Sequence, residues 1–224
     1  MNRKYLTVLI GALIIFTGCL SPAEMDYYQG IDVVPVEGYR PFILQNHNDS
    51  MVNSSTLLGN VTVFGFIHIN CQNFCPTTTL DMKWIQSQLT DEERELVNFV
   101  SITVDPWRDG PFGLSNYMEE YNVSWNHLTT RVDNLENLSL IEQVWTDFSI
   151  GVVLEEANNS TSLARGHTVY YNVEHTNGLV IVDSLGYQRV RWNQDYWNAD
   201  EILEDLRSVL QSSVIRDSIP ASTT

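Results

Sequence analysis

The segment Val61–Pro76 constrains the fold more than any other part of the sequence. Val61–Ile69 is β-branched, aromatic and almost wholly apolar, which is typical of a central strand buried on both faces. Cys71 and Cys75 follow within a few residues, and Pro76 is favoured in the first turn of a helix. The sequence therefore predicts a strand, a short turn that carries two thiols, and then a helix.

The rest of the chain alternates predicted strands with predicted helices. A polar segment rich in Asn and Ser, Glu155–Gly166, is expected to be a loop. The pattern predicts an α/β fold, a thioredoxin-like sandwich with a central mixed sheet flanked by helices and a C-terminal hairpin plus helix. Further strands are predicted at Pro41–Leu44, Val97–Val104, Thr168–Val173, Leu179–Asp183 and Gln188–Trp192. Apolar residues at helical spacing predict four helices. The first is opened by Pro76 and carries Leu80–Leu89, the second is opened by Asp109–Pro111 and carries Leu114–Tyr121, the third covers Leu138–Phe148, and the last starts at Asn198 and buries Ile202–Leu210.

Residues 1–18 have the pattern of an export signal rather than of a folded element. Arg3 and Lys4 precede the apolar run Tyr5–Phe16, whose 12 residues fall short of the ~20 that span a bilayer. The small residues before Cys19 resemble a bacterial lipobox, which implies cleavage before Cys19 and lipidation of its thiol. An ordinary signal peptide or an uncleaved anchor is the alternative. We expect an exported protein, anchored on the outer face of the cytoplasmic membrane.

Four segments are predicted along the 224 residues. They are a lipoprotein-like signal peptide (1–18), a tether punctuated by Pro and Gly (19–38), one thioredoxin-like domain (39–211) and a disordered tail (212–224). A hydrophobic content of 43% suffices for one domain with a proper core. The net charge of −16 repels nucleic acid, so DNA and RNA are not expected as partners.

The two remaining cysteines, Cys71 and Cys75, lie four residues apart. In an exported protein such a pair can be a disulfide, a redox couple or a metal site. A structural disulfide that closes so short a loop would remove little chain entropy, which favours a chemical role. The N-terminus of a helix lowers a thiol pKa, and two thiolates prefer soft ions such as Cu(I), or zinc.

A further ligand would have to come from one of five histidines. His47 lies in a polar turn, His127 in a predicted loop, and His68 in the central strand, where a histidine is usually a hydrogen-bonded core residue. His167 and His175 flank the strand that is predicted after the polar loop. Spacing alone does not choose among them.

Four stretches in order along the chain together resemble the Sco/SenC family of copper-binding, thioredoxin-like assembly proteins. Cys71-Gln-Asn-Phe-Cys75-Pro76 matches the family's Cys-x-x-x-Cys-Pro motif, and Ser101–Pro111 resembles its Ser-Val-Asp-Pro-x-Arg-Asp-Thr-Pro segment. Trp125 with Leu128-Thr129 resembles its Trp-x-x-Leu-Thr-Gly motif. Val173-Glu174-His175-Thr176 resembles its Val-Asp-His-Ser/Thr segment. The four stretches fall within about residues 40–210, essentially the whole predicted domain.

The resemblance implies a membrane-tethered copper metallochaperone that helps assemble the binuclear copper site of a terminal oxidase, with the copper-site subunit as its partner. It implies that Cys71, Cys75 and His175 bind copper, as Cu(I) or Cu(II), and that Asp105 lies near the site without being a ligand. This chain has Gln72-Asn73-Phe74 where the family commonly has Pro-Asp-Val. That departure removes a negative charge near the ion and leaves the ligand set intact.

Three other functions compete with this interpretation. A thiol–disulfide reductase would use Cys71 and Cys75 as a redox-active pair on the cysteines of the same client, so the enzyme assignment stays open. A peroxiredoxin-like peroxidase needs threonine three residues before its reactive cysteine, where this chain has His68 or Gln72. A tethered binding module with a structural disulfide and no metal is the third alternative.

Overall fold

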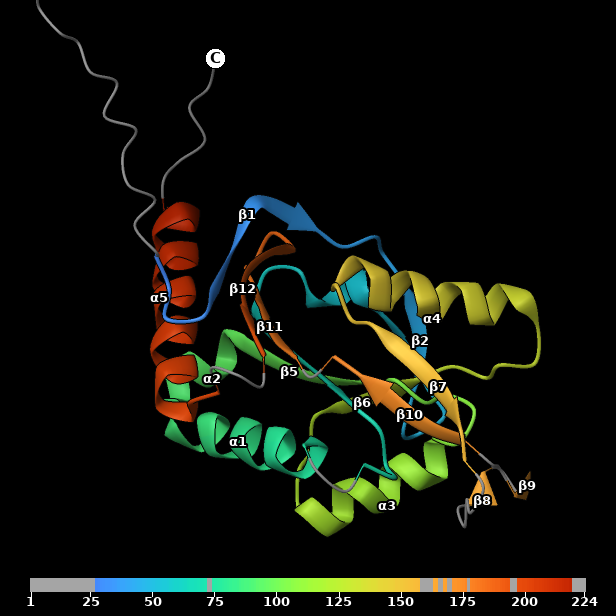
Figure 1. Ribbon diagram of the computed structural model, residues 1–224. Helices are drawn as coiled ribbons and strands as arrows, with labels where there is room; N and C mark the ends of the chain where they lie inside the picture. Colours follow the sequence, from blue (N-terminus) through green and yellow to red (C-terminus); the bar gives the residue numbers. More distant parts are fainter. Residues whose placement is uncertain are drawn as a thin grey trace, which may run out of the picture.

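The computed structural model describes residues 27–71, 74–157, 163–164, 167–168, 171–176, 178–193 and 197–218, and Figure 1 shows their arrangement. The strands are β1 (Ile31–Gly38), β2 (Ile43–Asn46), β3 (Met51–Asn53), β4 (Val61–Ile67), β5 (Val97–Thr103), β6 (Asn126–Thr129), β7 (Val152–Glu156), β8 (Leu163–Ala164), β9 (His167–Thr168), β10 (Tyr171–His175), β11 (Leu179–Val182) and β12 (Tyr187–Trp192). The helices are α1 (Cys75–Gln88), α2 (Asp91–Glu95), α3 (Pro111–Tyr121), α4 (Leu135–Asp147) and α5 (Ala199–Ser218), with a 3-10 turn at Ser54–Leu57.

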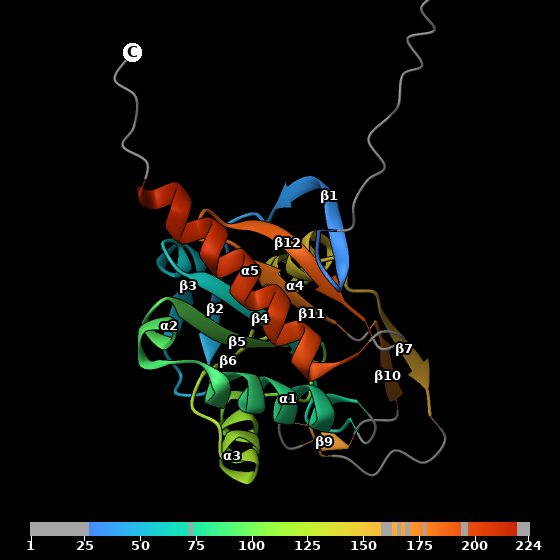
Figure 2. The same cartoon turned by 90° about the vertical axis from the view of Figure 1, so that its left-hand side faces the viewer.

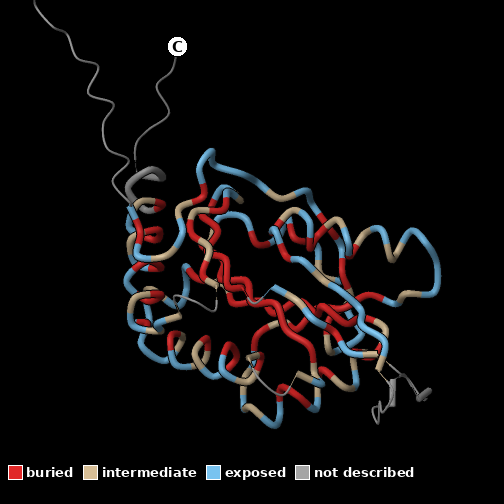
Figure 3. The backbone as a smooth tube through the Cα atoms, in the orientation of Figure 1, coloured by how far each residue is buried: buried red, intermediate tan, exposed pale blue. Residues whose placement is uncertain are grey.

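An eight-stranded mixed sheet forms the centre of the described part of the chain, in the order β1-β12-β11-β4-β5-β6-β2-β3. β4 pairs in parallel with β5, and β5 with β6, whereas the other neighbours are antiparallel. Every residue of β4 is buried, as its apolar composition predicts. Figure 3 shows this buried centre beneath exposed helices and loops. The sheet thus holds the end of β4, where the thiols follow, in the middle of the molecule.

Helices cover both faces of the sheet. Figure 2 shows α1 and α5 in front of one face, where they bury an apolar cluster against β4, β11 and β12. On the other face, α4 contributes Ile141, Val144 and Trp145 to a second cluster. A Cβ atom on Gly65 would lie 2.5 Å from Sδ of Met82, so this glycine lets α1 lie directly on β4. The predicted thioredoxin-like sandwich, with its C-terminal hairpin and helix, is confirmed.

Two predicted boundaries need correction. The tether expected over 19–38 is wrong for residues 31–38, which form β1 and pair with β12, and where Val33 is buried. Pro35 suggested a linker, but an edge strand tolerates proline where its pairing is irregular. The tail expected over 212–224 is wrong for residues 212–218, which belong to α5, and residues 219–224 lie outside the described ones. The predicted signal segment and Cys19 lie outside the described residues, and within the described ones no helix is long and apolar enough to cross a membrane.

A separate two-stranded ribbon, formed by β7 and β10, stands beside the sheet and is called the ribbon below. Its first strand corrects the predicted loop, because Glu155 and Glu156 belong to β7. Val153 and Leu154 are exposed there, so neither face of β7 shows the apolar alternation that indicates a half-buried strand. β10 begins at Tyr171 and carries His175 at its end.

Candidate metal centre

The two thiols lie where β4 meets α1, a region called the corner below (residues 67–71 and 74–76). A turn closes it, because the backbone N–H of Cys71 donates to the carbonyl of His68 at 3.2 Å. Helix α1 begins without a side-chain cap and without an acidic residue in its first turn. Instead, the backbone N–H of Cys75 donates to Sγ of Cys71 at 3.2 Å. The Cys71 sulfur therefore lies at the positive end of the helix dipole, where a negative charge is stabilised.

The two cysteines are free thiols with different surroundings. Cys71 is partly exposed, whereas Cys75 is 1% exposed and accepts a 3.5 Å contact from the backbone N–H of His68. The pKa of Cys71 is held far below its usual value, chiefly by a hydrogen bond from the Cys75 side chain and further by His175 and His68, against the opposing effect of burial. The pKa of Cys75 is raised because it donates that bond and because it is buried. Cys71 is thus the more acidic thiol of the pair, and Cys75 the less acidic one.

His175 reaches the same place from the ribbon. Its Nε2 lies 3.6 Å from Sγ of Cys75, although the two residues are 100 positions apart. Its Nδ1 lies 3.1 Å from the carbonyl oxygen of Thr176, which suits donation from Nδ1 and leaves Nε2 free to face the sulfur. Thr176 and Gly151 exchange hydrogen bonds at the ribbon's end, at 2.9 and 3.2 Å. The structure therefore brings together the three residues that the sequence pointed to.

Asp105 fixes the ribbon rather than the sulfurs. It is fully buried and forms an ion pair with Arg108, whose guanidinium lies 4.4 Å from the ring centre of Tyr171. The Tyr171 hydroxyl donates to Asp105 at 2.8 Å, and Arg108 donates to the Tyr171 carbonyl at 3.2 Å. In the described part of the chain, no hydrogen bond joins Asp105 to the thiols or to His175. Asp105 thus acts on the site indirectly, by holding the strand that carries His175.

Asp109 is a second buried acid that the sequence did not single out. Its carboxylate oxygen Oδ2 accepts from the hydroxyl of Thr103 at 2.6 Å and from the backbone N–H of Ile69 at 3.2 Å. Burial, with repulsion from Asp105, raises the pKa of Asp109 to about 8. The group is therefore mostly protonated at neutral pH, and it holds the chain at the base of the corner without adding a full negative charge.

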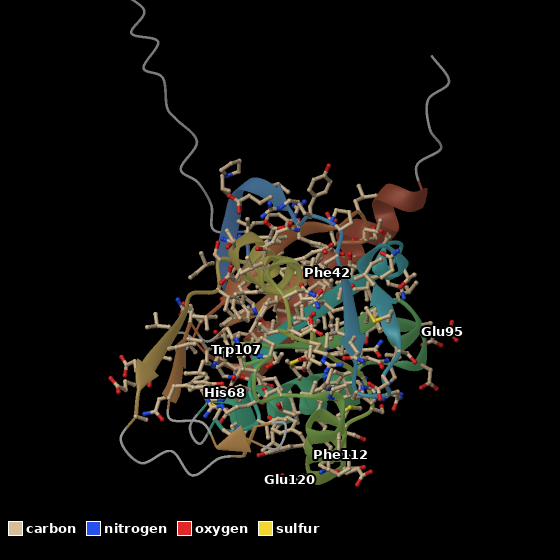
Figure 4. All side chains as sticks on the ribbon, turned by 90° about the vertical axis from the view of Figure 1, so that its right-hand side faces the viewer. Phe42, His68, Glu95, Trp107, Phe112 and Glu120 are labelled. Atoms are coloured by element: carbon tan, nitrogen blue, oxygen red, sulfur yellow. The ribbon has the colours of Figure 1, made fainter. Side chains whose placement is uncertain are left out.

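Four donor side chains converge between the corner and the ribbon. One ligand atom each from His68, Cys71, Cys75 and His175 can be chosen so that all four lie within 4.8 Å of one another. Two sulfurs and imidazole nitrogens form a donor set that suits Cu(I) or zinc, so these residues fit a soft metal ion. His68 directly follows β4, so the centre lies beyond the C-terminal end of that strand. Figure 4 shows His68 on the opposite side of the view from Glu95, which precedes β5.

Two other histidines, His127 and His47, lie outside this cluster. His127, expected in a loop, is fully buried in β6, where its ring stacks on Trp125 and its Nδ1 lies 3.2 Å from a carbonyl. His47 lies next to it in the polar turn, with ring centres 6.5 Å apart. His167 belongs to β9, but its side chain is outside what the structure describes.

The residue missed from the sequence is His68, whose only signal was its place three positions before Cys71.

Comparison with known proteins supports one family. The sequence model of the SCO1/SenC family matches residues 35–211. The chain belongs to the SCO1/SenC family. It is 35% identical over 134 residues to a candidate copper-binding protein of Stutzerimonas stutzeri, a match that spans 57% of this chain and 66% of that protein.

Solved Sco structures share the fold. Bradyrhizobium japonicum ScoI with copper bound is 22% identical, with a TM-score of 0.61 over 77% of this chain and 99% of ScoI. BsSco, described as a member of the Sco family of cytochrome c oxidase assembly proteins, is 24% identical, with a TM-score of 0.59 over 81% of this chain and 98% of BsSco. The family match and the shared fold thus agree with the resemblance seen in the sequence.

Proposed function

We propose that this protein is an exported, membrane-tethered copper chaperone that binds copper through Cys71, Cys75 and His175. The convergence of two sulfurs and the His175 Nε2 atom carries the proposal, because these donors meet only through the packing of the ribbon against the corner. Soft thiolates hold Cu(I), and an imidazole completes a small ligand set from which a receiving protein can take the ion. The client is the copper-site subunit of a terminal oxidase, in keeping with the described role of BsSco and with family membership.

Copper titration of the full reduced chain tests this proposal. One copper ion per chain is expected, with X-ray absorption showing sulfur and nitrogen ligands. His175→Ala should lower the copper affinity and remove one imidazole from the absorption spectrum. His47→Ala serves as the matched control, since His47 lies outside the cluster. A reduced chain that takes up no copper, or a His175→Ala variant with an unchanged spectrum, would refute the ligand assignment.

Thiol–disulfide exchange is the second candidate function. Its support is the contrast between a partly exposed Cys71, whose pKa is lowered, and a buried Cys75, whose pKa is raised. The Cys71 thiolate would attack a client disulfide, form a mixed disulfide and release one client thiolate, which takes up a proton. Cys75 would then lose its proton and attack Cys71 to release the second client thiol, leaving a Cys71–Cys75 disulfide. His175→Ala should keep most of this exchange, whereas it impairs copper binding.

The membrane tether is proposed to act through a lipid on Cys19. A tether raises the local concentration of the chaperone near a membrane-bound client. Cys19→Ser should release the protein from the membrane fraction while its copper stoichiometry stays unchanged. A Cys19→Ser protein that remains in the membrane fraction would show that another segment anchors it.

A further inference from the structure

His68 is a fourth donor beside the three residues of the proposed site. It follows β4 directly, is 6% exposed, and supplies the carbonyl that closes the turn to Cys71. A ring nitrogen of His68 lies within 4.8 Å of the sulfurs of Cys71 and Cys75. The His68 ring meets the ring of His175 edge-on, with centres 5.5 Å apart. The side chain therefore faces the sulfurs and the second imidazole, not the apolar core.

The imidazole of His68 does not have the hydrogen bonds that are usual for a histidine in a protein core. Its Nδ1 is buried and has no hydrogen-bond partner among the residues that the structure describes. A buried polar atom without a partner costs free energy, so such an atom requires an explanation. His127 has a similar unpartnered nitrogen, Nε2, but it belongs to no group of metal-ligating side chains among the described residues. Within the described part of the chain, the combination of an imidazole with an unpartnered nitrogen, two sulfurs and a second imidazole occurs at His68.

The geometry leaves room for one ion among four donors. Metal–ligand bonds of about 2.0–2.3 Å place the donors of a tetrahedral site about 3.3–3.8 Å apart. The four donor atoms lie within 4.8 Å of one another, and Cys75 Sγ lies 3.6 Å from His175 Nε2. Closing the donors onto an ion thus needs shifts on the order of 1 Å, which rotation of side chains can provide.

We propose that His68 is the fourth ligand of this centre, so that the chain surrounds its ion with two thiolates and two imidazoles. This inference rests on the proposed metal site at Cys71, Cys75 and His175. A closed tetrahedral set of two sulfurs and two nitrogens suits ions without a geometric preference of their own, Cu(I) or Zn(II). It also leaves no open position for a client's ligand, so transfer requires one imidazole to leave first. His175, on the ribbon, is that imidazole, while His68 and the two thiolates stay with the corner.

X-ray absorption of the full reduced chain loaded with Cu(I) tests the proposal. The wild-type spectrum should fit two sulfurs and two imidazoles, and His68→Gln should leave two sulfurs and one imidazole. Competition with a Cu(I) chelator should show at least a tenfold weaker affinity for His68→Gln, since even losing a group that only supports a ligand costs about 10–100-fold. His127→Gln is the matched control, because it replaces a buried strand histidine outside the cluster and should leave both readouts unchanged.

The other outcomes separate this inference from the proposed function. A wild-type spectrum with one imidazole, or an unchanged spectrum in His68→Gln, would overturn the assignment of His68 and leave the three-ligand site standing. Failure of the wild-type chain to bind copper would overturn both. If His68→Gln does not fold, His175→Ala decides: one remaining imidazole supports His68 as a ligand, and none refutes it.

Discussion

The corner and the ribbon supply the same centre in opposite ways. The corner brings His68, Cys71 and Cys75 together from eight consecutive residues at the end of a fully buried strand. The ribbon brings a single imidazole from far along the chain, on two strands that pair only with each other. The corner is therefore part of the sheet's core, whereas the position of His175 depends on how the ribbon docks. Affinity and release can then be set by different parts of the molecule.

Replacing a sulfur should have the largest effect, because it removes the part of the centre that the sheet holds in place. We expect Cys75→Ser to lose stoichiometric Cu(I) binding, since a hydroxyl is a hard donor and a poor ligand for a soft ion. Metal analysis after gel filtration measures the copper that stays with the chain. Full retention of copper by Cys75→Ser would show that the ribbon, not the corner, dominates binding.

Removing Arg108 should break the attachment of the ribbon. Arg108→Met leaves Asp105 buried without its cation, which we expect to lower the free energy of unfolding by about 3–5 kcal/mol. Urea unfolding followed by circular dichroism gives the value. The matched control is Arg131→Met, whose pair with Asp133 is exposed and should be worth less than about 1 kcal/mol. Equal losses in the two variants would contradict the anchoring role.

Acid should weaken the sheet through His127. Burial lowers the pKa of His127 from 6.5 to about 4, so the imidazole is neutral in the folded protein while the unfolded chain binds a proton first. This contribution to stability is complete above about pH 6.5 and is lost as the pH falls from 6.5 to about 4, by about 3 kcal/mol. Urea midpoints measured across this range should depend less steeply on pH in His127→Gln. An identical pH profile in the two proteins would argue against a neutral, buried His127.

A smaller change in the contacts among Asp105, Arg108 and Tyr171 should separate the docking of the ribbon from the folding of the domain. Tyr171→Phe removes the hydrogen bond to Asp105 and should cost about 1.5–3 kcal/mol, because the acceptor is charged. Copper affinity should fall with it, since His175 lies on the same strand, whereas the reactivity of Cys71 should change much less, because the hydrogen bond that chiefly lowers its pKa comes from Cys75. Chelator competition and thiol titration measure the two quantities. Tyr187→Phe, at an exposed position of β12, is the control.

The same contrast explains what the sequence could predict. Buried parallel strands have nearly continuous apolar sequences, so β4, β5 and the turn with its thiols followed from the residues alone. β7 escaped prediction because Val153 and Leu154 are exposed and no face of the strand is consistently buried. β1 was not predicted because a proline, here Pro35, usually argues against a strand.

The site divides in the same manner. Its sulfurs follow from local sequence, since the strand, turn and helix place them without reference to distant residues. His175 was identified only through resemblance to a family, because no local pattern can predict contact across 100 positions. His68 was read as a core histidine, since a histidine in an apolar strand usually is one. Only the structure shows that its ring faces two sulfurs and another imidazole.

Gly65 affects the position of the ligands although it is not a ligand itself. With no side chain to separate them, strand and helix touch at Met82, two turns along α1 from Cys75. The height of that helix above the sheet fixes where its first residue, Cys75, ends. A methyl group at position 65 would lie between β4 and α1 and push the helix away from the strand. The Cys75 sulfur would then move away from the other donor atoms of the centre. The metal affinity of the centre therefore depends also on core residues that do not contact the ion, such as the residue at position 65.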